Sequence, residues 1–325
     1  MIAYRRSMVM TGALLAAAVM NAGCSRQQPA TAAETVTARQ LQSAYVALVQ
    51  AGDADSLAAA ALASRTLADA AAHPARGLEF ANRANASAPE RADLAFLQMQ
   101  LCEATTSCDP TAAEANQRKA DPSNGISWLY ALRRAGRSHD AAGMRTALAG
   151  LAGSQRVDRH WTALASRMTA AMTAKAGLDA PTALSSLIDL EAALPMPLLS
   201  VTDACSEEAL QKTQVLVQCR RAAETLQHAD TISIAMYGTR LAVRLWPNGS
   251  ARSTEIAAGR ALAYQMDVMR RNSDRLDSPT ALQALARLYP HYPTEQSVIR
   301  ALYVALGLQP DPPTHWHETV FAGRL

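Results

Sequence analysis

The chain has 325 residues, of which 49% are hydrophobic and only 5% aromatic, and its formal net charge is +3 at pH 7. Basic residues are spread along the chain among acidic ones. Because phosphate binding needs a clustered basic face, this distribution argues against nucleic acid as a partner.

The N-terminus has the pattern of an export signal. Arg5 and Arg6 precede an apolar run of about 13 residues, and a pair of small residues then leads into Cys24. A membrane-spanning helix needs about 20 apolar residues, so we expect a cleaved signal peptide over residues 1–23. The junction resembles the lipobox of bacterial lipoproteins, although Asn21 stands where that pattern has an aliphatic residue. The resemblance implies lipidation of Cys24. The alternative is ordinary cleavage nearby, which leaves Cys24 as a free or paired thiol.

Residues 24–35 are small and polar and predict a flexible tether between the anchor and the first helix. The body that follows repeats apolar residues at helical spacing and shows almost no strand pattern. Its fold class is therefore predicted to be all-α, built from stacked antiparallel helical hairpins. The candidate helices span about 36–51, 53–71, 74–87, 90–104, 110–119, 124–136, 138–152, 157–175, 180–194, 197–205, 213–228, 230–246, 251–272, 279–289 and 294–306.

Start and stop signals bound the last two of these segments. Ser278 supplies an N-cap before Pro279, which suits the first helical position. Gly307 follows the final segment, where a left-handed C-cap is wanted. Beyond it, the proline-rich tail over 307–325 is predicted to be irregular.

One stretch, from Asp121 to Val157, carries a repeat-like arrangement. Trp128 takes the early aromatic position of a first helix, Gly136 lies in the turn, and Met144 lies on the apolar face of a second helix. This arrangement resembles tetratricopeptide repeats, over about residues 53–175, and the chain as a whole resembles uncharacterised exported helical-repeat proteins of Gram-negative bacteria.

The resemblance implies an α-solenoid with a concave surface for a protein or peptide. We expect a tetratricopeptide-like domain over residues 36–178 and a helical-hairpin region with an irregular tail over 179–325. Trp128, Tyr130 and Arg133 are the candidate residues of the binding surface.

Four cysteines lie beyond the tether, and an even number in an exported chain suggests disulfides. Proximity favours Cys102 with Cys108 and Cys205 with Cys219. A continuous helix would separate the second pair by about 21 Å at 1.5 Å per residue, so that bridge requires a turn between them, within 206–213. Four reduced thiols are the alternative.

The familiar nucleophile, phosphate-loop and zinc-protease motifs are missing from the sequence. His315 and His317 would point the same way in an extended segment, but no convincing third ligand lies nearby, and we expect Trp316 between them to pack on the last helices. His139 and His160 are expected to be surface or cap residues. No metal and no cofactor are predicted.

The sequence therefore favours a binding or scaffolding protein of the bacterial envelope, facing the periplasm and held at the outer membrane by its lipid. Its expected partners are a protein or peptide and the membrane. A cell-wall-directed enzyme, with a carboxylate and histidine site assembled only by the fold, is the alternative. A purely structural envelope protein is the third hypothesis.

Overall fold

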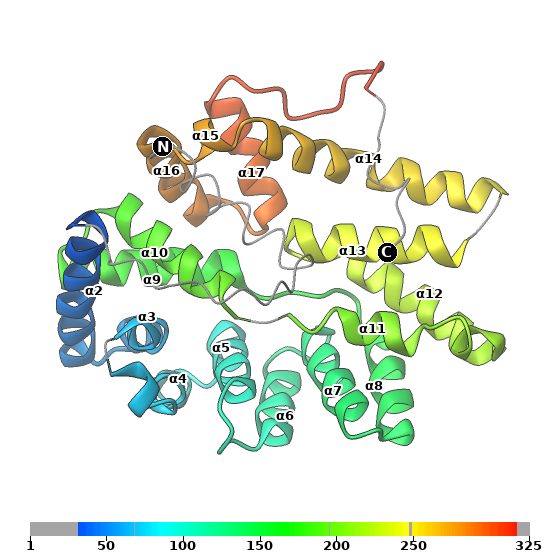
Figure 1. The fold of residues 1–325 in the computed structure, drawn as a ribbon, viewed down its shortest axis with the longest axis horizontal. Helices are drawn as coiled ribbons and strands as arrows, with labels where there is room; N and C mark the ends of the chain where they lie inside the picture. The colour runs from blue at the N-terminus through cyan, green and yellow to red at the C-terminus, as the bar shows by residue number, and fades with distance from the viewer. Residues whose placement is uncertain (1–31, 68, 195, 247–248, 317–325) are drawn as a thin grey trace.

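The computed structural model describes residues 32–67, 69–194, 196–246 and 249–316 (Figure 1). Over these residues it is all-helical, as predicted, and the only β-type pairing in this part of the chain is an isolated bridge between Asn124 and Arg156. The α-helices are α2 (Ala32–Ala51), α3 (Ala54–Ala63), α4 (Arg76–Ser87), α5 (Ala92–Glu103), α6 (Pro110–Ala120), α7 (Ile126–Arg137), α8 (Ala141–Gly153), α9 (Trp161–Ala176), α10 (Ala180–Ala192), α11 (Leu199–Ala204), α12 (Thr213–Gln227), α13 (Ile232–Leu245), α14 (Gly249–Arg271), α15 (Ser273–Leu276), α16 (Pro279–Leu288) and α17 (Glu295–Ala305).

Most predicted helices occur within a few residues of their expected ends. The predicted helix over 53–71 is the main exception, because its α-helical part ends at Ala63. The Ser64 hydroxyl donates to the Ala61 carbonyl, and Leu67 is already extended, with φ −65° and ψ 148°. A side chain that bonds the backbone locally competes with helix propagation, which is consistent with this early end.

Successive helices from α2 to α8 pack against one another and form a row along one side of the molecule (Figure 1). The alanine-rich α3 is buried almost completely. Close approach at this position depends on small residues, since a Cβ atom on Gly77 of α4 would lie 2.8 Å from the Ala61 carbonyl oxygen of α3. The many small residues of the chain thus allow these two helices to pack closely.

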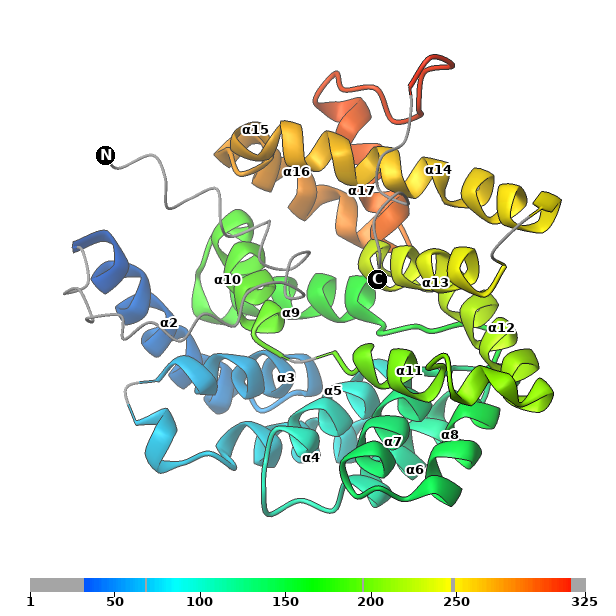
Figure 2. The same cartoon turned by 45° about the vertical axis from the view of Figure 1, so that its right-hand side comes forward.

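After α8 the chain turns back over the row. Helix α9 packs on α2, α3 and α5, and α11 packs on α7 and α8 (Figures 1 and 2). Helix α12 packs on α8 and α13, α13 on α14, and α16 returns to α10. One face of the row is therefore covered by later parts of the same chain.

Both predicted cysteine pairs lie at disulfide distance. Cys102 and Cys108 close the corner between α5 and α6, with Cα atoms 5.3 Å apart. Cys205 and Cys219 are joined across the turn between α11 and α12, with Cα atoms 5.9 Å apart. A 3₁₀ segment at Ala209–Gln211 provides the turn that the second pair requires.

The predicted signal peptide, Cys24 and residues 24–31 of the predicted tether lie outside the described residues. Residues 32–35, the rest of the predicted tether, belong to helix α2 instead. Within the described part, no helix combines the length and the apolar character that crossing a bilayer requires.

Removing the Cys205–Cys219 bridge tests the covalent contribution to the fold. Cys205→Ala/Cys219→Ala should lower the free energy of unfolding by about 3 kcal/mol, measured by urea denaturation, because the unfolded chain regains loop entropy. The Cys102–Cys108 bridge closes a shorter loop, so Cys102→Ala/Cys108→Ala should lower the free energy of unfolding slightly less, by about 2 kcal/mol. Free thiols at these four positions in the native wild type would contradict the assignment.

Candidate functional site

The candidate site is built around an extended segment, Ser154–His160, that joins α8 to α9. Its backbone runs beside the α6–α7 turn, where the Gln155 N–H donates to the Ser123 carbonyl at 2.9 Å. The Gly125 N–H donates in turn to the Arg156 carbonyl at 2.7 Å. These bonds flank the isolated bridge and replace the helical hydrogen bonds that an extended segment lacks.

Asn124 continues this pairing with its side chain. Its amide nitrogen donates to the Asp158 carbonyl at 2.6 Å, and its amide oxygen accepts from the Asp158 N–H at 2.9 Å. The same oxygen accepts from the Ile126 N–H at 3.0 Å, at the start of α7. Asn124 is 1% exposed. One buried amide thus satisfies the backbone of two segments that are 34 residues apart.

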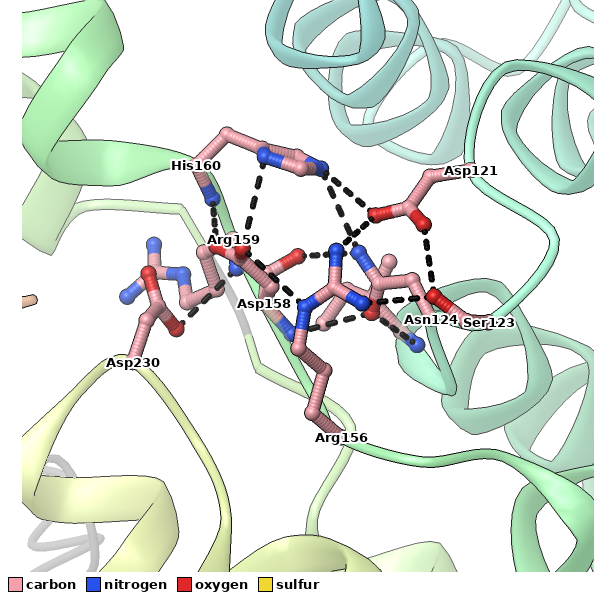
Figure 3. A network of polar contacts seen from close by, with 9 residues as sticks. Asp121, Ser123, Asn124, Arg156, Asp158, Arg159, His160 and Asp230 are labelled. Carbon is pink, nitrogen blue, oxygen red and sulfur yellow. Dashed lines mark hydrogen bonds and ion pairs between the residues drawn. The ribbon is translucent and has the colours of Figure 1, made fainter. Parts of the chain in front are cut away.

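The α12–α13 turn approaches the segment through Asp230. The Arg159 N–H donates to the Asp230 carboxylate at 3.0 Å, and the Asp230 N–H donates to the Val157 carbonyl at 3.1 Å. The Asp230 carbonyl accepts from the N–H of Glu295, where α17 begins. We call residues 121–125, 154–160 and 229–232 together the central junction (Figure 3).

A cluster of charged side chains covers the junction (Figure 3). Asp121 accepts from the Arg156 guanidinium at 2.7 Å and lies 3.3 Å from Nε2 of His160. Asp158 lies 3.5 Å from Nδ1 of His160 and 3.5 Å from Nε of Arg156. The two carboxylates and the two basic groups therefore alternate around one centre.

The electrostatics of this cluster favour the charged forms of its members. Burial acts to raise the pKa of Asp121, but the hydrogen bond with His160 and the charge of Arg156 outweigh it and lower the pKa to about 2. Burial acts to lower the pKa of His160, and here the bond to Asp121 and the charge of Asp158 prevail, so that the pKa is raised. The cluster thus favours an imidazolium between two carboxylates.

Asp230 behaves in the opposite way. Burial, followed by the charge of Asp158, raises the pKa of this carboxyl to about 7, against the opposing bond from the Arg159 N–H. The Arg159 guanidinium itself pairs with Glu191 of α10. The junction therefore holds one strongly ionised carboxylate, at Asp121, and one carboxyl that binds a proton near neutral pH.

Three of these residues have atoms placed for metal binding. Asp121, Asp158 and His160 each offer one ligand atom, and these atoms lie within 4.8 Å of one another. Arg156 pairs with both carboxylates, so each of them already has a cationic partner within the chain.

The predicted binding-surface residues are buried or half-buried and contact other residues of the chain. Tyr130 is fully buried, with its hydroxyl 3.9 Å from the sulfur of Met196, so its prediction as a surface residue is wrong. Arg133 pairs with Glu103 of α5, and Trp128 lies under the guanidinium of Arg118. The chain turning back over α7 is the physical reason that Tyr130 is enclosed.

Of the other sequence candidates, His160 differs most from expectation. It occupies the N-cap position of α9, as one of the two expectations held, but its side chain makes no cap bond and its ring lies inside the junction. His139 is exposed, as expected. Trp316 packs on α14 as expected, with its indole N–H donating to Asp267, whereas His317 lies outside the described residues.

Comparison of the chain with known protein families, curated proteins and solved structures finds no match.

Replacing Asn124 tests whether the junction stabilises the fold. Asn124→Ala leaves the backbone of Asp158 and the Ile126 N–H unsatisfied in a buried place, so the free energy of unfolding should fall by roughly 2–4 kcal/mol. Asn116→Ala, at an exposed position of α6, is the control and should change it by less than about 0.5 kcal/mol. Equal stabilities of the two variants in urea denaturation would contradict the role of Asn124.

Replacing Asp230 tests the buried carboxyl. Its folded pKa of about 7 lies above the unfolded value of 3.8, so its contribution to stability is complete below about pH 4 and is lost as pH rises through 7. Asp230→Asn keeps an oxygen acceptor and cannot ionise, so it should gain stability relative to the wild type between pH 4 and pH 8. Urea denaturation at both pH values measures this gain, with exposed Asp203→Asn as control. A stability difference that does not change with pH would refute the prediction.

Proposed function

We propose that this protein is an exported, lipid-anchored helical protein that binds a protein or peptide partner in the bacterial envelope, facing the periplasm. Cys24 and the signal pattern support export, and the two cysteine pairs at disulfide distance agree with an oxidising compartment. The observation that carries the binding proposal is the row of paired helices from α3 to α8. Rows of helix pairs present extended surfaces, and such surfaces are common binding sites for other chains.

The proposed binding face is the side of the row that the chain leaves uncovered. Helices α9 and α11 cover α3, α5 and α7, and α12 packs on one side of α8, whereas α4, α6 and the rest of α8 carry exposed side chains. Among the exposed residues are Ala86 of α4, Ala115 of α6 and Ala149 of α8. The Cys102–Cys108 bridge and the central junction hold these helices in place, and a preorganised surface loses less conformational entropy when it binds.

Site-specific photocrosslinking in cells tests this proposal. A photoreactive residue placed at Ala86, Ala115 or Ala149 should give the same discrete light-dependent product if one partner contacts α4, α6 and α8. Ala257, an exposed alanine on α14, is the matched control and should not give this product. Crosslinks at Ala257 alone, or no discrete product at any position, would overturn the proposed face.

One observation favours the enzyme alternative, in which a cell-wall-directed activity uses a site assembled by the fold. The junction does bring carboxylates and a histidine together, and the raised pKa of Asp230 resembles that of a catalytic acid. We place this alternative second because Asp121 is engaged by Arg156 and His160, and Asp230 by the Arg159 N–H. Asp230→Asn should leave the function intact if the protein is a binding module and abolish it if the protein is an enzyme.

A further inference from the structure

We propose that His160 is a pH-dependent clasp, which fastens the α6–α7 turn to the start of α9 when protonated and releases it when deprotonated. This proposal does not depend on the identity of any partner. It rests on the position of one imidazole ring between two carboxylates that belong to different segments of the chain (Figure 3).

The ring contacts each carboxylate through a different nitrogen. Nε2 lies 3.3 Å from the Asp121 carboxylate, on the turn after α6, and Nδ1 lies 3.5 Å from the Asp158 carboxylate, on its own segment. Only the imidazolium carries a proton on both nitrogens, so only the charged ring can donate to both carboxylates. The clasp across the two segments is therefore complete only in the protonated state.

The neutral ring has an alternative partner already in place. The Asn124 amide nitrogen lies 3.3 Å from Nε2, and after deprotonation it can donate to that nitrogen. The single remaining proton then stays on Nδ1, where it faces Asp158. Deprotonation thus removes the donor to Asp121 and keeps the Nδ1 proton that faces Asp158, so the loss falls on the contact between segments.

The charged groups that face the ring come from all the elements around it. Asp121 follows α6, Arg156 and Asp158 lie on the α8–α9 segment, and Asp230 lies on the α12–α13 turn. With His160 protonated, the charges of Asp121, Asp158, Arg156 and His160 sum to zero. With His160 neutral, Arg156 alone faces two ionised carboxylates, so the cluster gains a net negative charge.

The backbone at His160 has an uncommon conformation that one other histidine of the chain shares. His160 has φ 54°, in the left-handed region that side-chain-bearing residues seldom adopt. His139 has the same φ of 54° before α8, yet it is exposed. The chain therefore offers a matched pair of left-handed histidines, one within the carboxylate pair and one at the surface.

The sign of the pH effect follows from the raised pKa of His160. A raised folded value means that this group stabilises the folded state fully below its unfolded pKa near 6.5, and that the stabilisation is lost as pH rises through the folded value. We therefore expect the clasp to be closed in mildly acidic medium and open in alkaline medium.

The test compares His160→Asn with His139→Asn, because asparagine tolerates the left-handed conformation at both positions. Midpoints of thermal unfolding are measured on the full chain from pH 5.5 to 9, with EDTA present to exclude metal binding. The midpoint difference between wild type and His160→Asn should shrink as pH rises, and the difference for His139→Asn should stay constant. A His160→Asn difference that is independent of pH would overturn the proposal.

A second measurement begins with the wild-type protein. In wild-type protein labelled at its histidine rings, the His160 signal should titrate with a pKa above 6.5 in NMR spectra. Asp121→Asn should lower that pKa, since it removes one of the two facing carboxylates. A His160 signal that titrates at or below 6.5 in the wild type, or one unmoved by Asp121→Asn, would contradict the clasp.

Discussion

The structure depends on how an extended segment satisfies its backbone inside an otherwise helical protein. Helices satisfy most of their own N–H and C=O groups, but Ser154–His160 cannot, and unpaired buried groups of this kind are costly. Asn124 on one side and Asp230 on the other supply hydrogen bonds to this segment. The chain can therefore leave the row of helices at α8 and cross back over it without exposing this stretch of backbone to water.

This constraint also decides which surfaces remain for a partner. Because the segment carries the chain back across the row, α9 and α11 cover α3, α5 and α7. That face is covered by the protein's own helices, whereas α4 and α6 carry exposed side chains. The proposed binding face is therefore the face that remains after the junction has directed the chain back over the row.

The electrostatics of the junction follow from the same geometry. Charged side chains that flank a buried backbone pairing are partly removed from water, so each needs a partner from the chain. Asp121 and Asp158 find theirs in Arg156 and His160, whereas Asp230 has mainly backbone donors and binds a proton instead. One junction therefore contains groups whose pKa values are displaced in opposite directions from their ordinary values.

The sequence predicts the helices and cysteine pairs well because both depend on local patterns. Apolar spacing places the helices, and the turn between Cys205 and Cys219 follows from the reach of a disulfide. The junction could not be predicted, since Asn124 and Asp158 meet only after the chain has folded. The burial of Tyr130 could not be predicted for the same reason: its position on the helix can be read from the sequence, but its contact with the later residue Met196 cannot.

Hydrogen exchange of backbone amides in the native protein tests the central role of the junction most directly. If the junction holds the row and the later helices together, the N–H groups of Gly125, Asp158 and Arg159 should exchange only through global unfolding. Their opening free energies should then equal those of the buried amides of α7 and α13. Opening free energies several kcal/mol lower at these three amides would show that the fold persists when the junction opens, which would contradict the account.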